Sequence, residues 1–387
     1  ALVKNTTGQC NTAVGGQNAL ACNTTGSTNT AIGYDALCAN TTAGDNTAVG
    51  KNSLKANTTG TLNNAVGSGA LMANTTGSNN VALGNDALRF NTTADNNTAV
   101  GYQALFDNTT GTVNTAMGRQ ALQNNTTADG NTAYGHNTLN TATTNGCNTA
   151  VGGSVLFNAT GHSNTGVGHS ALSGLTSGNE NTGVGRDVMG AAVTGAGNSS
   201  LGYFTLNALT SGSTNTAVGN GSSPILTTGS NNTTIGAAAG ISLTTGSNNL
   251  LLGHDAGRSG SPGGLINTGS NQVVLGDENI TDLFCADTSI SSSDQRDKTD
   301  IEDFTHGLNF ITKLNPKTYK WDKRAWYISE NGSPQDFLNA TPDGSKKKNK
   351  KHIGFMAQDI LALEKEIGFA NDRDDMLIVN QTEDETQ

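Results

Sequence analysis

The segment Asn11-Thr12-Ala13-Val14-Gly15 recurs with small variations along most of the 387-residue chain. The glycines that close the repeats are separated by 18 residues, then 17 seven times, 16 once, 17 five times and finally 23. They are Gly15, Gly33, Gly50, Gly67, Gly84, Gly101, Gly118, Gly135, Gly152, Gly168, Gly185, Gly202, Gly219, Gly236, Gly253 and Gly276. Because the period is nearly constant, each repeat adds one equal structural unit to the one before it.

The residue types of the repeat favour short strands and corners over helices. Thr, Asn and Gly dominate, and no apolar period of 3.6 residues persists. The sequence therefore predicts a mainly β fold, a parallel β-solenoid or β-roll of about sixteen 17-residue coils. Coils stacked about 4.8 Å apart would form a rod roughly 75 Å long.

Two apolar rows recur along the repeats, and we expect both to point into the core. The first row precedes the closing glycines and consists of Val14, Ile32, Val49, Val66, Leu83, Val100, Met117, Tyr134, Val151, Val167, Val184, Leu201, Val218, Ile235, Leu252 and Leu275. The second row lies four residues after most of the closing glycines and consists of Leu37, Leu54, Leu71, Leu88, Leu105, Leu122, Leu139, Leu156, Leu172, Met189 and Leu206.

Between these rows runs Asn-Thr-Thr-Gly or a close variant. Gly and Asn tolerate positive φ, so this segment and the closing glycine are expected to form corners, with short strands between them. Stacked Asn and Thr side chains are expected to form hydrogen-bonded ladders. After Gly219 the Leu row gives way to Ser223, Gly240 and Gly257, so we expect the rod to change its cross-section or end there.

Composition divides the chain near residue 290. The first 290 residues hold 7 Lys and Arg and 13 Asp and Glu, whereas residues 291–387 hold 14 and 18. Both tryptophans lie in the second region, and 45 of the 50 glycines lie in the first. We expect a repeat shaft over residues 1–276, a linker and cleavage region over 277–292, and a small α+β domain over 293–387.

The formal net charge of −10 and the lack of a basic stripe argue against nucleic acid as a partner. No stretch is long and apolar enough for membrane insertion. The basic run at 346–351 is expected to be a solvated loop, with contact to an acidic partner fibre as the alternative. Because the sequence does not begin with Met, we expect a fragment of a longer protein.

The side chains that could carry chemistry in the repeats show no recurring pattern. Five cysteines at irregular spacing predict small buried thiols rather than disulfides or a zinc site, and no metal or cofactor is expected. The scattered acids do not show the paired spacing of a glycosidase, although pairs formed between coils stay open. These acids include Asp35, Asp86, Glu180 and Asp187.

The C-terminal region has a different amino-acid composition. Apolar residues at 3- and 4-residue spacing predict an amphipathic helix from Ile301 to Leu314, and Pro316 prevents its continuation. The apolar residues of that face are Ile301, Phe304, Leu308, Ile311 and Leu314. A strand is expected over 318–321, and a second helix over 357–367 with Met356, Ile360 and Leu363 on one face.

Three ordered motifs in this region resemble the intramolecular chaperone and self-cleaving peptidase domain at the C-terminus of endosialidases and many phage tail fibres. They are Ser-Asp-Gln-Arg-Asp-Lys at 293–298, Leu-Asn-Pro-Lys-Thr-Tyr-Lys-Trp at 314–321, and His-Ile-Gly-Phe-Met-Ala-Gln-Asp at 352–359. The resemblance implies a catalytic dyad of Ser293 and Lys298 and a cut between Ser292 and Ser293. The residues that match and support the motifs are Asp294, Arg296, His352, Gly354 and Gln358.

The implied chemistry is sensible, because a serine hydroxyl is a weak nucleophile until a base takes its proton, and Lys acts as that base only with a lowered pKa. Without the resemblance, Ser and Lys five residues apart would carry no meaning. His352 is open to two interpretations, orienting a group at the scissile bond or a structural role. Domains of this family usually end in long helices that form a coiled coil, so we expect 293–387 to be truncated at its C-terminus.

The repeats resemble the β-rolls of trimeric bacterial adhesin heads and of some bacteriophage fibres. Together the two resemblances imply a homotrimeric phage tail-fibre or tailspike shaft for host-surface attachment, located in the virion and extracellular after release. The implied partners are two further copies of the chain, a host-surface polysaccharide or protein receptor, and other virion tail proteins. The alternatives are a bacterial trimeric adhesin head, a polysaccharide-cleaving spike and an ice-binding solenoid.

Overall fold

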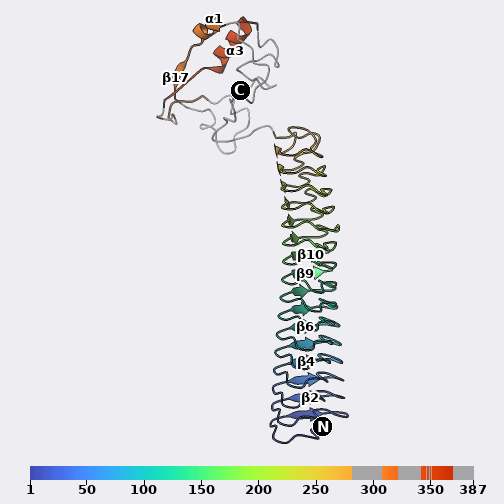
Figure 1. Ribbon diagram of the computed structural model, residues 1–387. Coiled ribbons are helices and arrows are strands. Elements are labelled where there is room, and N and C mark those ends of the chain that lie inside the picture. Colours follow the sequence, from blue (N-terminus) through green and yellow to red (C-terminus); the bar gives the residue numbers. More distant parts are fainter. Residues whose placement is uncertain (281–306, 321–340, 346, 348, 350, 369–387) are drawn as a thin grey trace. The chain divides into compact units, whose positions relative to one another are not determined.

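The computed structural model describes residues 1–280, 307–320, 341–345, 347, 349 and 351–368. The chain divides into two compact units, Ala1–Phe284 and Cys285–Gln387. The first unit is the predicted β-solenoid, drawn from blue to yellow in Figure 1. No helix within the described ranges is both long and apolar enough to cross a bilayer.

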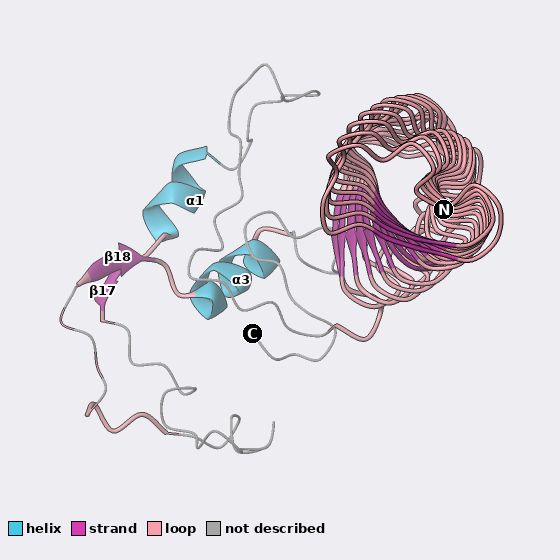
Figure 2. Ribbon diagram, turned by 90° about the horizontal axis from the view of Figure 1, so that it is seen from below, coloured by secondary structure: helices cyan, strands magenta, loops and turns pink. Residues whose placement is uncertain are grey.

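Sixteen short strands stack in sequence order into one parallel sheet. Register is kept throughout, so that Thr98, Ala99 and Val100 lie beside Thr115, Ala116 and Met117 of the next coil. The strands are β1 (Thr12–Val14), β2 (Thr30–Ile32), β3 (Thr47–Val49), β4 (Asn64–Val66), β5 (Val81–Leu83), β6 (Thr98–Val100), β7 (Thr115–Met117), β8 (Thr132–Tyr134), β9 (Thr149–Gly153), β10 (Thr165–His169), β11 (Thr182–Val184), β12 (Ser199–Leu201), β13 (Thr216–Val218), β14 (Thr233–Ile235), β15 (Leu250–Leu252) and β16 (Val273–Leu275). Viewed along the axis in Figure 2, the strands lie on one side of a closed ring of loops. The prediction of a parallel β-solenoid is confirmed.

The expectation that the apolar row before the closing glycines points inward is wrong. None of its sixteen residues is buried, and Val14 and Tyr134 are 54% and 55% exposed. The central residue of the strand points inward instead, as Ala31 and Ala99 do with no exposed surface. Alternation along a strand puts the first and third residues on the same face, so the Thr and Val rows are both turned outward.

The lack of space inside the coil explains why the small residue is the buried one. A Cβ added to Gly183, which replaces Ala in its strand, would lie 2.9 Å from the Leu172 side chain and 3.0 Å from that of Val188. At Gly166 the same added atom would lie 2.5 Å from Val155. Both valines occupy a position that holds Ala in most other coils. The larger Val side chain is therefore matched by a Gly in place of Ala at the strand position that it contacts.

The second apolar row is buried as predicted. Every residue from Leu37 to Leu206 in that row has no exposed surface. A third inward row belongs to the Asn-Thr-Thr-Gly segments and runs from Asn23 to Asn125. From there on it becomes apolar, with Ala142, Ala159, Leu175, Val193, Leu209, Leu226, Leu243 and Ile266.

This change explains why the rod does not end after Gly219. Where the Leu row becomes Ser223 and Gly240, the third row supplies Leu226 and Leu243, and the strand centre becomes Leu251. The sheet continues through β16, and the core keeps apolar volume by moving it to other rows.

Buried asparagines form the predicted ladders. The Asn40 side-chain amide donates to the Asn23 side-chain oxygen at 2.8 Å, and the same bond recurs coil after coil up to Asn125. A second ladder lies just before the strands, where the Asn97 backbone N–H donates to Asn80 Oδ1 at 3.0 Å. These bonds satisfy polar groups that the solenoid interior removes from water.

The corners use glycine for two different reasons. The closing glycines have φ between 75° and 142°, as expected for turns. The glycine of Asn-Thr-Thr-Gly has no positive φ, but an added Cβ on Gly77 would lie 2.4 Å from the Ala94 carbonyl oxygen of the next coil. At this second glycine position, the close approach of the backbones of neighbouring coils therefore excludes a side chain.

The described cysteines are not the buried thiols expected from the sequence. Cys10 and Cys147 are exposed, whereas Cys22 and Cys38 are partly buried. Burial raises the pKa of the Cys38 thiol above its usual value. All four are free.

The described part of the second unit contains α1 (Gly307–Lys313), β17 (Lys317–Tyr319), β18 (His352–Gly354) and α3 (Ala357–Glu366). The start of the first predicted helix, 301–306, lies outside the described residues. Within α1 the expected apolar face is not the buried one, because Leu308 and Ile311 are exposed and Phe310 is buried. The second predicted helix is confirmed, with Ile360 and Leu363 buried.

Candidate functional site

Two of the three C-terminal motifs are brought together by a small antiparallel sheet. Strand β17 comes from the motif at 314–321, and β18 opens the motif at 352–359. Their register sets Tyr319 opposite His352 and Lys317 opposite Gly354. The pairing of two segments more than thirty residues apart was not evident from the sequence, because each is only three residues long (Figure 2).

Gly354 of β18 lies close to the Tyr319 ring of β17. A Cβ added there would lie 3.4 Å from Cε1 of that ring, which is ordinary van der Waals contact. The two motifs therefore come within contact distance at this glycine and this tyrosine.

Helices α1 and α3 are joined by an ion pair between Lys313 and Glu366. Gln358 lies in the first turn of α3 and is exposed. Ile360 and Leu363, two and five residues further on, are buried. The third motif therefore passes from β18 into α3 and presents Gln358 on the surface.

The implied catalytic dyad and two of the motif-supporting residues lie outside the described part of the chain. Ser293, Lys298, Asp294 and Arg296 fall within 281–306, as does the bond between Ser292 and Ser293. His352 lies in β18. The dyad stays a prediction drawn from the motifs.

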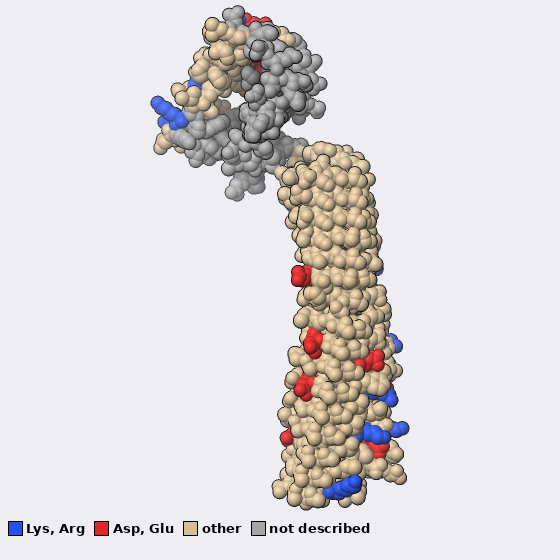
Figure 3. Space-filling model, viewed as in Figure 1, with Lys and Arg blue, Asp and Glu red and all other residues tan. Residues whose placement is uncertain are grey.

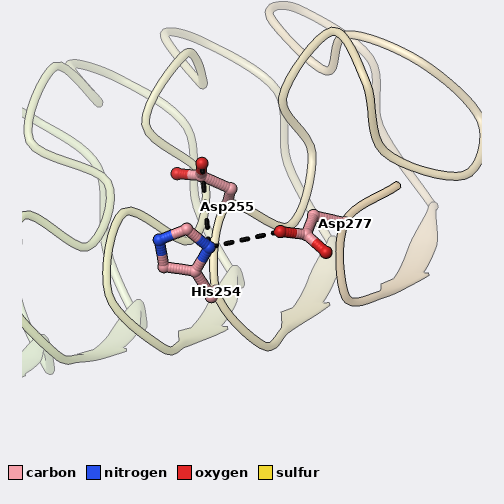
Figure 4. A group of neighbouring side chains, drawn as sticks. All are labelled: His254, Asp255 and Asp277. Carbon is pink, nitrogen blue, oxygen red and sulfur yellow. Dashed lines mark hydrogen bonds and ion pairs between the residues drawn. The ribbon is translucent and has the colours of Figure 1, made fainter. Parts of the chain in front are cut away.

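A cluster of titratable groups lies at the C-terminal end of the solenoid (Figure 4). His254 Nδ1 lies 3.2 Å from Asp277 Oδ2 and 3.7 Å from Asp255 Oδ2. His254 and Asp255 follow β15, and Asp277 follows β16, so the cluster bridges the last two coils. In sequence His254 and Asp277 are separated by the 23-residue interval that departs from the regular period.

Both carboxylates of this cluster have protein partners. Arg258 donates to Asp255 at 2.6 Å, and Asn279 donates its backbone N–H and its side-chain amide to Asp277. The Asn279 backbone N–H, followed by His254, lowers the pKa of Asp277 below its usual value. A general acid for glycoside cleavage needs a raised pKa instead, so these contacts fit a link between coils better than catalysis.

The donor atoms of His254, Asp255 and Asp277 all lie within 4.8 Å of one another, a spacing that ligands of one cation can have. The sequence pattern missed this group because its members lie on different coils. The one local signal is the position of His254 and Asp277 directly after the closing glycines Gly253 and Gly276.

Comparison with known proteins bears on the C-terminal motifs. Residues 293–368 match the model of the family described as chaperone of endosialidase. No curated protein and no solved structure matches the chain. All three motifs lie within the matched range, so a segment similar to the chaperone of endosialidase follows the parallel β-solenoid in this chain.

Proposed function

We propose that the chain is a homotrimeric shaft protein of a phage tail fibre or tailspike that attaches to a host-surface polysaccharide or protein. A C-terminal chaperone over 293–387 trimerises it and then cuts itself off. The shaft is residues 1–276 and the cleavage region 277–292. The observation that carries the proposal is the chaperone-family match at 293–368 directly after an in-register solenoid. The protein would reside in the virion and contact other tail proteins there.

The repeat itself supplies a reason for such a chaperone. Neighbouring coils present almost the same rows, so a slip of one coil between chains keeps nearly every contact and loses only those at the ends. A domain that joins the three C-termini first fixes the starting register. It also raises the local concentration of the chains.

The proposed cleavage follows from the chemistry of the two motif residues. Lys298 accepts the proton of the Ser293 hydroxyl, whose oxygen attacks the carbonyl carbon of Ser292. The bond between that carbon and the Ser293 nitrogen breaks, and the nitrogen leaves protonated. Water then hydrolyses the ester, which leaves a carboxylate on Ser292 and restores the Ser293 hydroxyl.

Denaturing electrophoresis and intact-mass measurement of freshly expressed protein test this proposal. We expect wild-type protein to break between Ser292 and Ser293, and Ser293→Ala and Lys298→Ala to stay whole. Ser291→Ala is the matched control and should be cut like the wild type. An unbroken wild-type chain that still forms trimers would remove the peptidase role and leave the fibre shaft.

A further inference from the structure

The outward face of the long parallel sheet lacks charge from end to end. In each strand from β1 to β16 the first and third residues point outward, and none of these thirty-two described positions holds Lys, Arg, Asp or Glu. We call this surface the strand face. The charged side chains of the described shaft lie outside the strands, and Figure 3 shows acidic and basic ones among those in view.

The third-position row of the strand face exposes apolar side chains that a solvated surface would not need. Nine of the sixteen are at least 36% exposed, and they lie on strands all along the sheet. They are Val14, Ile32, Val66, Leu83, Met117, Tyr134, Leu201, Ile235 and Leu275. A continuous apolar surface of this length marks a contact with another macromolecule.

The size of the strand face suits a stable interface. Sixteen strands about 4.8 Å apart make a strip about 72 Å long, and at about 10 Å wide it offers ~700 Å² per chain. A standard interface uses about 800 Å² per partner. The strip therefore provides most of the area that one partner needs.

The partner must present an uncharged strip of the same length and period, and a second copy of this chain does so. In a closed threefold assembly, the residues nearest the axis meet their own copies. A charged row there would repel itself, whereas a Val and Leu row packs against itself and is removed from water. A surface at the threefold axis must therefore hold no charged residue in any coil, and the strand face meets this condition.

We propose that the strand face is the contact between shafts in the assembly, with the third-position row turned toward the threefold axis. This inference rests on the proposed homotrimer, and adds which surface of the solenoid the copies share. The corners, with their charged and polar side chains, then form the outer surface of the shaft.

Charge substitutions on two surfaces of the same coils test the strand face. Leu83→Glu combined with Met117→Glu places two carboxylates on the strand face of each full-length chain. Thr76→Glu combined with Thr110→Glu places the same charge on exposed corner residues. Oligomer mass is measured by sedimentation equilibrium, and folding by far-ultraviolet circular dichroism.

We expect wild type and the corner variant to sediment at three times the 39.4 kDa chain mass, less any released segment. The strand-face variant should assemble about 100-fold more weakly or worse, because unpaired charges would be buried. A strand-face variant that trimerises like the wild type overturns the strand-face assignment and leaves the trimer standing. A monomeric wild type overturns the trimer itself.

Hydroxyl-radical footprinting of the unmodified protein tests the same assignment without any variant that could fail to fold. In a single chain Tyr134 is 55% exposed, whereas Tyr34, Tyr102 and Tyr203 are each 45% exposed. The strand-face contact predicts that Tyr134 becomes several-fold less modified than the other three. If Tyr134 is the most modified of the four, the strand face is open to solvent and the assignment is wrong.

Discussion

Leucine in the left-handed backbone region is the most unusual residue-scale feature of the coils. Leu54, Leu88 and Leu105 have φ between 49° and 51°, and the same conformation recurs along the Leu row. That region costs an L-residue roughly 1–2 kcal/mol. Complete burial of a Leu side chain contributes about 1.5–3 kcal/mol, so burial outweighs the backbone preference at this position.

Asparagine at the entry to each strand has an equally specific role. Asn97 receives the Asn114 backbone N–H on its Oδ1 at 2.9 Å and donates its Nδ2 to the Gly111 carbonyl at 2.8 Å. Each contact joins one coil to the next. Neither partner has access to water, since Asn114 and Gly111 are buried.

Replacing Asn97 by Ala is therefore expected to lower the free energy of unfolding by about 2–4 kcal/mol, because two buried polar groups lose their partners. Hydrogen exchange measured on the coils around β6 and β7 reports the loss locally. Asn85→Ala is the control, because Asn85 is exposed and outside the ladder. Equal effects of the two substitutions would contradict a special contribution from the ladder.

At the scale of elements, the corner after β2 is linked to the corner after β3 by charge. Lys55 Nζ lies 2.8 Å from Asp35 Oδ2, and Asn18 donates to Asp35 Oδ1 at 2.9 Å from the preceding coil. The hydrogen bond from Lys55, followed by that from Asn18, lowers the pKa of Asp35 below its usual value. The carboxylate thus ties three successive coils together.

This link predicts an acid-sensitive step in the N-terminal coils. Because the folded-state pKa of Asp35 is lowered, its contribution to stability is present above the unfolded pKa of about 3.9 and is lost as pH falls through the folded value. Asp35→Asn should flatten the fall of the thermal midpoint below about pH 4.

The partner residue provides the matched pair for that experiment. Lys55→Met should flatten the acid profile as Asp35→Asn does, whereas Lys55→Arg, which keeps a cation beside Asp35, should preserve it. An unchanged profile in both Asp35→Asn and Lys55→Met would show that other carboxylates control the acid response.

At the scale of the whole molecule, a stack of sixteen near-equal coils is stabilised mainly by contacts between neighbours. A slip of one coil between chains keeps nearly every contact, so the proposed chaperone would act as a template during assembly. If the proposed cleavage removes this template, refolding loses its starting point and the folded shaft is held kinetically.

Uncleaved and cleaved protein are therefore expected to differ in the reversibility of their unfolding. After unfolding in guanidinium and dilution, Ser293→Ala protein should regain trimers, whereas purified, cleaved wild-type shaft should regain at least several-fold fewer. Sedimentation and circular dichroism measure the recovery. If both recover equally, the shaft carries its own register information and a template is not needed.

Much of this architecture was predictable because a repeated sequence repeats its local geometry. The 17-residue period determined the number of coils, the position of the closing glycines such as Gly84, the buried Leu row and the Asn ladders. The three ordered motifs predicted the similarity of residues 293–368 to the family described as chaperone of endosialidase.

Tertiary structure determined which strand residues point inward and which distant residues meet. Neither follows from the alternation of side chains along a strand or from the period of the repeat. A three-residue strand can turn either Ala99 or its neighbours Thr98 and Val100 inward, and the choice depends on the space that the Leu and Asn rows of other segments leave. For the same reason the sequence alone did not place His254 beside Asp277, or Tyr319 beside His352. Those contacts join residues far apart in the chain, and only the packing of whole coils and strands brings them within reach.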